Sequence, residues 1–347
     1  MQLATASEHN AKGAATPDEI GFVKAVDRLS ALNASDLQLV NEEIYRQLDS
    51  SVSIIPSLAR HLLEAGGKRL RPILTLSTAR MLGYNGPHHI NLAAAVELIH
   101  GATLLHDDVV DASDMRRGSQ TANVIWGNKE SVLVGDFLFS RAFELMVAAE
   151  NLNILQILSN ASGVIAEGEV LQLATQKNIN ATFEMYLAVV ESKTAALFAA
   201  ASRAGAVIAG ASDQTEDALR RYGRNLGVAF QLVDDALDYS GLEETLGKNV
   251  GDDFREGKMT LPIVYSISRA DANELKFWKR VISDGHQEPD DFSQACEIIN
   301  RNGALQDTFA CARRYADRAL EDLSSAPENE YSQALADLAE KSVSRIY

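Results

Sequence analysis

Long apolar segments with helical spacing, separated by short runs of glycine and proline, constrain this chain more than any other feature. Between residues 37 and 62, leucine, isoleucine and valine recur at the three- and four-residue intervals of an amphipathic helix. Longer segments of about 20 residues lie at 91–110, 129–149 and 213–239, and several of the long segments are apolar almost all round. A helix without a polar face is buried inside a bundle. No run alternates as a β-strand does, so the sequence predicts an all-α fold.

The chain has 347 residues, and no low-complexity linker divides it. We therefore expect one large helical bundle at residues 19–347 rather than two domains. Residues 1–18 are small and polar, and we expect a flexible N-terminal tail there. They lack the apolar core of a secretory signal, and no apolar run reaches the roughly 18 residues of a membrane span. These observations favour a cytoplasmic protein.

The composition argues against two functional classes. There are 48 acidic and 32 basic residues, a net charge of −16, and no basic stripe that would bind nucleic acid. The two cysteines, Cys296 and Cys311, fit neither a disulfide framework nor a zinc site. In so acidic a protein, an anionic ligand requires positive groups concentrated at its binding site.

Two acidic clusters end two of the long apolar segments. Spacings of three and four residues place carboxylates on one helix face, where they repel one another. The helix dipole also disfavours negative charge at a C-terminus. A solvated acidic helix end explains one such motif, but a pair is better explained by Mg²⁺, which takes carboxylate and phosphate oxygens. The motif Asp-Asp-x-x-Asp comprises Asp107, Asp108 and Asp111, and again Asp234, Asp235 and Asp238.

Basic residues near these clusters indicate an anionic ligand between the metal sites. Arginine suits bidentate contacts with phosphate, and lysine supplies a point charge. Each of these residues, taken alone, is more simply explained as half of a surface salt bridge. Together they give an acidic protein local positive charge. They lie in the turn at residues 66–72, at Arg116 and Arg117, and at Lys193, Lys248 and Lys258.

Six ordered segments resemble the trans-type (all-E) polyprenyl diphosphate synthases, especially the long-chain octaprenyl, nonaprenyl and decaprenyl enzymes. They cover most of residues 60–265 in the family's order. The resemblance implies an isoprenoid-synthase bundle with a central apolar cavity, where isopentenyl diphosphate is condensed head-to-tail onto an allylic diphosphate. The segments are GGKRLRP at 66–72, ELIHGATLLHDDVVD at 97–111, RRG at 116–118, KT at 193–194, FQLVDDALD at 230–238 and GKNVGDDFREGKMTLP at 247–262.

The resemblance also implies a role for each matching residue. The six aspartates would hold about three Mg²⁺ ions per active site. The released diphosphate would accept the proton, so no protein base is needed. The allylic diphosphate would be contacted by Arg116, Lys193 and Lys258, and the reacting carbons by Thr194 and Gln231, with Lys248 nearby. Isopentenyl diphosphate would be held by Lys68, Arg71, His100 and Arg117.

Spacing supports two of these roles. His100 lies two helical turns before the first cluster, and Gln231 lies one turn before the second. A buried structural histidine and a locally bonded glutamine are the alternatives. His106 is expected to point away from the cluster. His88 and His89 follow a proline, and we predict a polar loop there.

Small residues one turn before the first cluster predict a long product. Ala102 and Thr103 stand where an aromatic ring would close the cavity floor. We expect an open tunnel and a product of about forty to fifty carbons, which the resemblance links to quinone side chains. Release of so apolar a product implies transient, peripheral contact with the inner membrane face. The resemblance further implies a homodimer, with residues 129–149 and 151–175 as its interface.

Three other functions remain open at this point. A terpene cyclase would need neither the turn with Lys68 and Arg71 nor a second symmetrical aspartate motif. A non-catalytic subunit of a heteromeric synthase should have lost aspartates or the Lys-Thr pair. A shorter-chain farnesyl or geranylgeranyl synthase would have the same chemistry, and Ala102 and Thr103 argue against it.

Overall fold

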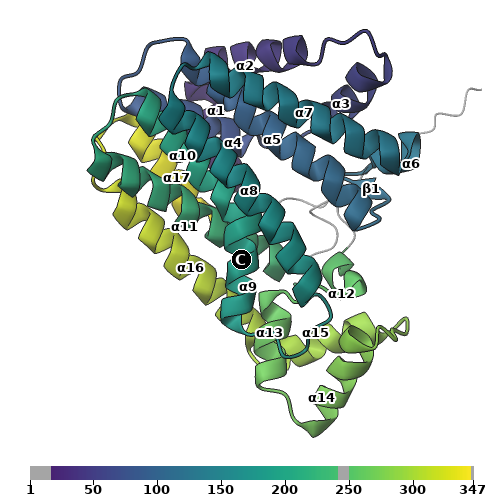
Figure 1. The fold of residues 1–347 in the computed structure, drawn as a ribbon. Helices are drawn as coiled ribbons and strands as arrows, with labels where there is room; N and C mark the ends of the chain where they lie inside the picture. The colour runs from purple at the N-terminus through teal and green to yellow at the C-terminus, as the bar shows by residue number, and fades with distance from the viewer. Residues whose placement is uncertain (1–16, 241–249, 345–347) are drawn as a thin grey trace, which may run out of the picture.

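The computed structural model describes residues 17–240 and 250–344 (Figure 1). Within these ranges the fold is helical apart from one short hairpin, which confirms the predicted all-α class. None of the described helices is long and apolar enough to cross a membrane. The first helices are α1 (Pro17–Leu32), α2 (Ala34–Gln47), α3 (Ile54–Glu64), α4 (Leu70–Met81), α5 (His88–Val110), α6 (Ala122–Trp126) and α7 (Asn128–Ala148).

The second half of the chain continues the bundle and adds a smaller group of helices at its lower end in Figure 1. The hairpin between α5 and α6 consists of β1 (Met115–Arg116) and β2 (Ser119–Gln120). The later helices are α8 (Leu152–Thr175), α9 (Phe183–Val190), the π-helix η1 (Glu191–Ala195), α10 (Ala196–Ile208), α11 (Asp213–Leu237), α12 (Asp252–Glu256), α13 (Leu261–Ser268), α14 (Ala272–Trp278), the π-helix η2 (Lys279–Ser283), α15 (Asp291–Arg301), α16 (Ala304–Leu323) and α17 (Glu330–Ser342).

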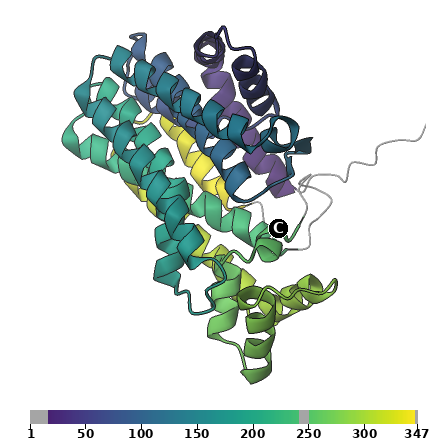
Figure 2. The ribbon, with the colours of Figure 1, turned by 45° about the vertical axis from the view of Figure 1, so that its right-hand side comes forward.

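Helices α5 and α11 form the centre of the bundle, as their apolar sequences predict. Helix α5 packs against α4, α7 and α10, and α10 also packs against α11. Figure 2 shows the same long helices running side by side from a second direction. Most of α5 is buried, so that its last turn, which carries the first aspartate cluster, is held by packing on several sides.

Two apolar clusters meet along α11. One contains Tyr222 and Leu226 with residues of α4, α5, α7, α8 and α10. The other contains Leu232 and Val233 with residues of α13 to α16. Helix α11 therefore runs from the first apolar cluster into the second. Its C-terminal aspartates belong to the half that packs in the second cluster. The end of α11 is fixed by both parts of the core.

The predicted polar loop at His88 and His89 is wrong. Helix α5 begins at His88, and His89 is only 2% exposed. Its Nε2 lies 3.1 Å from Oδ2 of Asp36, a carboxylate that also accepts bonds of 2.6 and 2.7 Å from Arg80. The position after a proline suggested a turn. Nothing local indicates burial, because the partner of the His89 side chain, Asp36, lies 53 residues earlier.

Candidate active site

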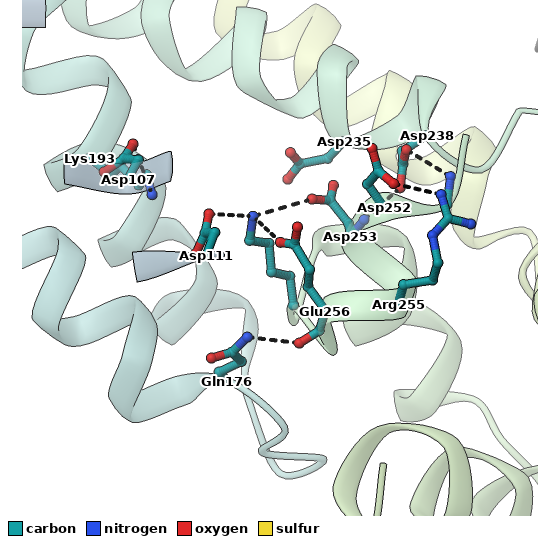
Figure 3. A network of polar contacts seen from close by, with 12 residues as sticks. Asp107, Asp111, Gln176, Lys193, Asp235, Asp238, Asp252, Asp253, Arg255 and Glu256 are labelled. Carbon is teal, nitrogen blue, oxygen red and sulfur yellow. Dashed lines mark hydrogen bonds and ion pairs between the residues drawn. The ribbon is translucent and has the colours of Figure 1, made fainter. Parts of the chain in front are cut away.

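The two aspartate clusters lie at neighbouring helix ends. Asp107 and Asp108 belong to the last turn of α5, and Asp234 and Asp235 to the last turn of α11. Figure 3 shows Asp107 and Asp111 on one side of the site, with the second cluster across from them. A cavity of about 140 Å³ lies here. Its lining includes Lys193, Thr194, Gln231, Asp235, Asp253 and Lys258.

Two lysines bridge from other elements to the first cluster. The Nζ atom of Lys193, in η1, lies 2.7 Å from Oε2 of Glu169 and 3.5 Å from Oδ2 of Asp107. The Nζ atom of Lys258 lies 3.1 Å from Oδ2 of Asp111. Burial lowers the pKa of Lys258, but the surrounding carboxylates outweigh burial and raise it well above the ordinary value. Lys258 is therefore charged, and the two lysines face Asp107 and Asp111.

The other aspartates are bonded to their own surroundings. Asp108 accepts bonds from Nε and Nη2 of Arg116 at 2.8 and 2.7 Å. Asp235 accepts from the Tyr186 hydroxyl at 2.6 Å and from Nε2 of Gln231 at 2.7 Å. Burial above all raises the pKa of both carboxyl groups. A negative charge at either position is thus costly without a cation nearby.

Asp238 stabilises the start of α12. Its Oδ1 accepts from the backbone N–H of Gly251 at 2.9 Å, and its Oδ2 from that of Asp253 at 3.1 Å. This arrangement is a helix cap supplied by a residue from another helix. It fixes α12, and with it Asp253, which lies 3.9 Å from Lys258. Each Asp238 oxygen keeps a second lone pair, so its metal role stays a prediction.

The donor set fits Mg²⁺ in chemistry. The ligand atoms that converge are carboxylate oxygens, which a hard cation prefers. Burial and the charge of Asp107 raise the pKa of Glu169, so negative groups are crowded beyond what the lysines neutralise. Among the described residues, no three acidic, histidine or cysteine side chains form a ready metal centre. A cation here therefore needs further ligands, such as water and phosphate oxygens.

The hairpin carries the arginine pair. Its turn, Arg117 and Gly118, has φ values of 51° and 79°, the positive values that a two-residue hairpin turn requires. The guanidinium of Arg117 lies over Gly67, where a Cβ would come within 2.6 Å of Nη1. The sequence analysis missed this hairpin because strands of two residues are too short to alternate. The turn brings Arg116 to the first cluster and Arg117 to the glycine turn.

Arg71 and His100 form a half-buried pair. Nη1 of Arg71 lies 3.0 Å from Nε2 of His100, and the guanidinium stacks over Phe198 at 4.7 Å. Burial, followed by the charges of nearby arginines, holds the pKa of His100 well below its ordinary value. The imidazole is therefore neutral, with Nε2 accepting from Arg71 and the proton on Nδ1. Nearby, Nζ of Lys68 lies 4.3 Å from the centre of the Phe22 ring.

Lys193 and Thr194 lie in a π-helix, an irregularity that the sequence did not predict. Thr194 donates its hydroxyl proton to Oε1 of Gln231 at 2.8 Å. Single π-turns inside α-helices occur often at functional sites. The turn lies between α9 and α10 and faces the cavity with both residues. The π-helix thereby places Lys193 and Thr194 between the two aspartate clusters.

The remaining predicted site residues are Lys248, Ala102 and Thr103. Lys248 lies outside the described residues. Ala102 is completely buried in the apolar core, and Thr103 is half-buried with its hydroxyl donating to the carbonyl of His100 at 2.8 Å. Neither lines the 140 Å³ cavity. Their effect on product length therefore stays a prediction.

Comparison with known proteins identifies the family. The model of the family described as "Polyprenyl synthetase" matches residues 52–299, more than half of the chain. The chain belongs to the polyprenyl synthetase family. An octaprenyl diphosphate synthase from Haemophilus influenzae is 44% identical over 93% of this chain and 98% of its own length.

Two solved structures of the family are similar to this chain over their whole length. A decaprenyl diphosphate synthase from Rhodobacter capsulatus has a TM-score of 0.90 and 50% identity, covering 93% of this chain and 99% of its own. A polyprenyl synthase from Caulobacter crescentus, solved with calcium and isoprenyl diphosphate, has a TM-score of 0.89 and 54% identity, with 93% and 98% covered.

Sequence reasoning missed several residues of this polyprenyl synthetase site. Tyr186 resembles any core aromatic residue, and nothing local sets it apart. Glu169 lies in the largely apolar helix α8, where its charge was the one available signal. Asp253 belongs to the segment at residues 247–262 that resembles the family, but no role was predicted for it. Gln176, at the end of α8, donates to the backbone carbonyl of Glu256 at 2.7 Å (Figure 3) and thereby holds the loop before Lys258.

Proposed function

We propose that this chain is a prenyltransferase that condenses isopentenyl diphosphate head-to-tail onto an allylic diphosphate, making a long-chain all-trans polyprenyl diphosphate. The observation that carries the proposal is a cavity lined by Asp235 of the second cluster and by Lys193 and Lys258, whose ammonium groups reach Asp107 and Asp111 of the first cluster. Long-chain names among the relatives agree with it. A terpene cyclase or a non-catalytic subunit would not need every part of this arrangement.

The metal is proposed to be Mg²⁺, with about three ions per site. Asp107 and Asp111 are the strongest candidates for direct ligands, because their ion-pair partners Lys193 and Lys258 are cations that a metal ion can replace. Asp234 is the corresponding candidate on α11. We assign Asp108, Asp235 and Asp238 chiefly to supporting bonds. When bound, Mg²⁺ would neutralise the charge that develops on the departing diphosphate.

The cations are proposed to divide between the two substrates. Arg116, Lys193 and Lys258 surround the aspartates and suit the allylic diphosphate, as electrostatic stabilisation of a leaving group requires. Lys68, Arg71, His100 and Arg117 lie together around the glycine turn and suit isopentenyl diphosphate. His100 contributes there as a neutral donor through Nδ1. Lys248 is proposed to act near the allylic group, as the resemblance implies.

The residues of the π-helix are proposed to protect the reacting carbons. An allyl cation is captured by water unless the site excludes it. Val189 and Val190 of α9 and Met259 give the cavity an apolar side, and Thr194 and Gln231 are among its polar lining residues. The double bond of isopentenyl diphosphate attacks the cation, and the released diphosphate takes the proton.

We propose a product of about forty to fifty carbons, the lengths that the names octaprenyl and decaprenyl of the relatives express. Ala102 and Thr103 leave room below the first cluster, and quinone side chains are the proposed use. The test incubates the protein with farnesyl diphosphate, labelled isopentenyl diphosphate and Mg²⁺, and sizes the dephosphorylated product by mass spectrometry. A product of fifteen or twenty carbons would keep the chemistry and reject the tunnel. No elongation would favour a non-catalytic subunit.

The metal requirement has its own test. EDTA should abolish turnover, and excess Mg²⁺ should restore it, because carboxylates this crowded need a cation before they accept a diphosphate. Full activity in EDTA contradicts the magnesium proposal. The same preparation can be titrated with Mn²⁺ to count binding sites in the presence of inorganic pyrophosphate.

The assembly is proposed to be a homodimer through α7 and α8. These helices expose several large apolar side chains, an unusual surface for an isolated chain. Sedimentation equilibrium should give twice the chain mass; a monomer at all concentrations would reject the dimer. Peripheral membrane contact during product release is proposed from the product's apolarity. The large apolar side chains that α7 and α8 expose at the proposed dimer interface are Leu133, Phe143, Val147, Leu152, Val170 and Leu173.

A further inference from the structure

Tyr186 has no role in the site as proposed so far, yet its position is specific. It lies on α9, is 6% exposed, and lines the cavity. Its hydroxyl donates to Oδ2 of Asp235 at 2.6 Å. A phenylalanine would fill the same space without requiring a polar partner, so the hydroxyl needs an explanation beyond packing.

The hydroxyl begins a chain of four side chains. The second oxygen of Asp235 accepts from Nε2 of Gln231 at 2.7 Å, and Oε1 of Gln231 accepts from the hydroxyl of Thr194 at 2.8 Å. Both oxygens of Asp235 are acceptors in these hydrogen bonds, Oδ2 from Tyr186 and Oδ1 from Gln231. Asp235 therefore forces Gln231 to turn its NH₂ group inward and its carbonyl toward Thr194. The direction of every hydrogen bond in the chain is set at the Asp235 end.

The consequence appears at Thr194. Its only proton is directed at Gln231, so its oxygen lone pairs are left for the cavity that it lines. Thr194 follows Lys193, whose ammonium lies 3.5 Å from Asp107. An oxygen fixed with its lone pairs outward stabilises positive charge that develops beside it, and a hydroxyl proton in the same place would destabilise it.

We propose that Tyr186 is a positioning residue for the condensation: by donating to Asp235 it fixes the direction of the chain Asp235–Gln231–Thr194 and keeps the Thr194 lone pairs facing the allyl cation. This inference rests on the proposed function. It assigns Asp235 to the orientation of Gln231 as well as to the metal region. Tyr186 itself does not touch the reacting carbons.

The variant Tyr186→Phe removes one oxygen and keeps the ring. It leaves one buried oxygen of Asp235 without a donor, so the carboxylate and the Gln231 amide lose their fixed orientation. A hydrogen bond to a charged group corresponds to about a ten- to hundredfold rate effect. We expect a single-turnover rate lower by about tenfold or more, with little change in the KM of either substrate.

Tyr222→Phe is the matched control. Tyr222 is also buried and donates its hydroxyl to one acceptor, the carbonyl of Leu335, at 2.8 Å. This substitution removes the same atom from α11 at a place remote from the cavity. It should lower the melting temperature about as much as Tyr186→Phe does, and leave the single-turnover rate unchanged.

A double-mutant cycle separates a connected chain from independent effects. Gln231→Leu breaks the chain beyond Asp235, so adding Tyr186→Phe to it should cost little further rate. Binding of Mn²⁺ with inorganic pyrophosphate, followed by electron paramagnetic resonance, should be unchanged in Tyr186→Phe. The combined result expected is a slower chemical step, non-additive with Gln231→Leu, at unaltered metal binding.

Three results would overturn the inference. One is a wild-type single-turnover rate in Tyr186→Phe. Another is a fall in Mn²⁺ binding that parallels the rate, which would assign Tyr186 to the metal site instead. The third is full additivity with Gln231→Leu. A wild-type protein that fails to elongate farnesyl diphosphate overturns the proposed function itself, and is distinguished by the assay before any variant is compared.

Discussion

Asp238 is the residue whose surroundings depart furthest from the role that its motif predicts. Both of its oxygens accept hydrogen bonds from the backbone at the start of α12, whereas Asp234 lies one turn earlier, within α11. Asp238→Asn keeps one acceptor and presents an NH₂ group to the other backbone N–H. We expect its Mg²⁺ requirement to stay near that of the wild type while amide exchange accelerates at residues 250–257. Asp234→Asn should instead raise the Mg²⁺ concentration for half-maximal activity by about tenfold or more.

The contrast between the two variants decides the role of Asp238. Each removes one charge from the same cluster, so general electrostatics affect both. Equal shifts in the Mg²⁺ requirement, without faster amide exchange, would identify Asp238 as a metal ligand and reject the cap as its main function.

His89 makes folding stability depend on pH. Burial lowers its pKa, and hydrogen bonds from Arg80 and His89 overcome burial to hold the pKa of Asp36 below its ordinary value. In both groups the unfolded chain binds the proton more readily, so stability falls as pH falls. The His89 part is lost below about pH 6.5 and the Asp36 part only near pH 4.

Urea denaturation between pH 7.5 and 5 measures the His89 contribution. His89→Gln should flatten the dependence, because glutamine can still donate to Asp36 and does not titrate. The substitution can lower the slope of the free energy of unfolding against pH by at most about 1.4 kcal/mol per pH unit, the value for one proton. His88→Gln, the neighbouring and less buried position, is the control and should leave the slope unchanged. A wild-type protein with no loss of stability in this range would contradict the argument.

At the scale of elements, the contact of α8 with η1 positions Lys193. A Cβ at Gly168 would lie 2.7 Å from Cβ of Ser192 and 2.9 Å from the backbone nitrogen of Lys193. Gly168→Ala should therefore displace the π-helix, lower the free energy of unfolding by about 1–3 kcal/mol and reduce turnover. Gly163→Ala, on the same helix with nothing within 4 Å, should gain about 0.5–1 kcal/mol. Similar stabilities and activities for the two variants would show that α8 yields freely at this contact.

The elements that the sequence predicts well are those governed by local pattern. The buried helices α5, α7 and α11 follow from apolar residues at helical spacing, and the end of α5 at Val110 agrees with the prediction. The π-helix at Lys193 and the hairpin at Arg117 depend on tertiary contacts and leave no periodic signal. His89 shows the same limit, since its burial is justified only by Asp36 on another helix.

In the candidate site, the sequence located charged groups but not their partners. Repeated aspartates and basic motifs stand out because folding does not favour them. Tyr186 and Glu169 are invisible in the same reading, since a tyrosine or a glutamate in a helix is ordinary. Only the fold brings Glu169 on α8 to Asp107, and Tyr186 on α9 to Asp235.

For the whole molecule, the acidic composition and the anionic ligands are reconciled by where charge is placed. The net charge is −16, but the cations that matter are gathered around the ends of α5 and α11. Apolar clusters on either side of α11 hold these ends in place. The protein can therefore be acidic as a whole while positive charge is concentrated at the site.

The length of the product is a property of the whole bundle, because a growing chain must pass between its helices. Thr103 lies one turn before Asp107 and is half-buried, so Thr103→Phe places a ring below the first cluster. We expect products shortened toward fifteen or twenty carbons, at near-normal stability. Ala102→Phe should shorten them too, but its site is fully buried, and overpacking should cost about 1–3 kcal/mol.

Leu104→Phe provides the control for this experiment, since residue 104 is turned about 100° around α5 from Thr103. Product length is measured by mass spectrometry after dephosphorylation, and stability by thermal unfolding. Because a ring blocks only the path it occupies, a shortened product for Thr103→Phe with an unchanged one for Leu104→Phe locates the tunnel on the face of α5 that bears Asp107. An unchanged product in both Thr103→Phe and Ala102→Phe would require the polyprenyl chain to leave the site by another route.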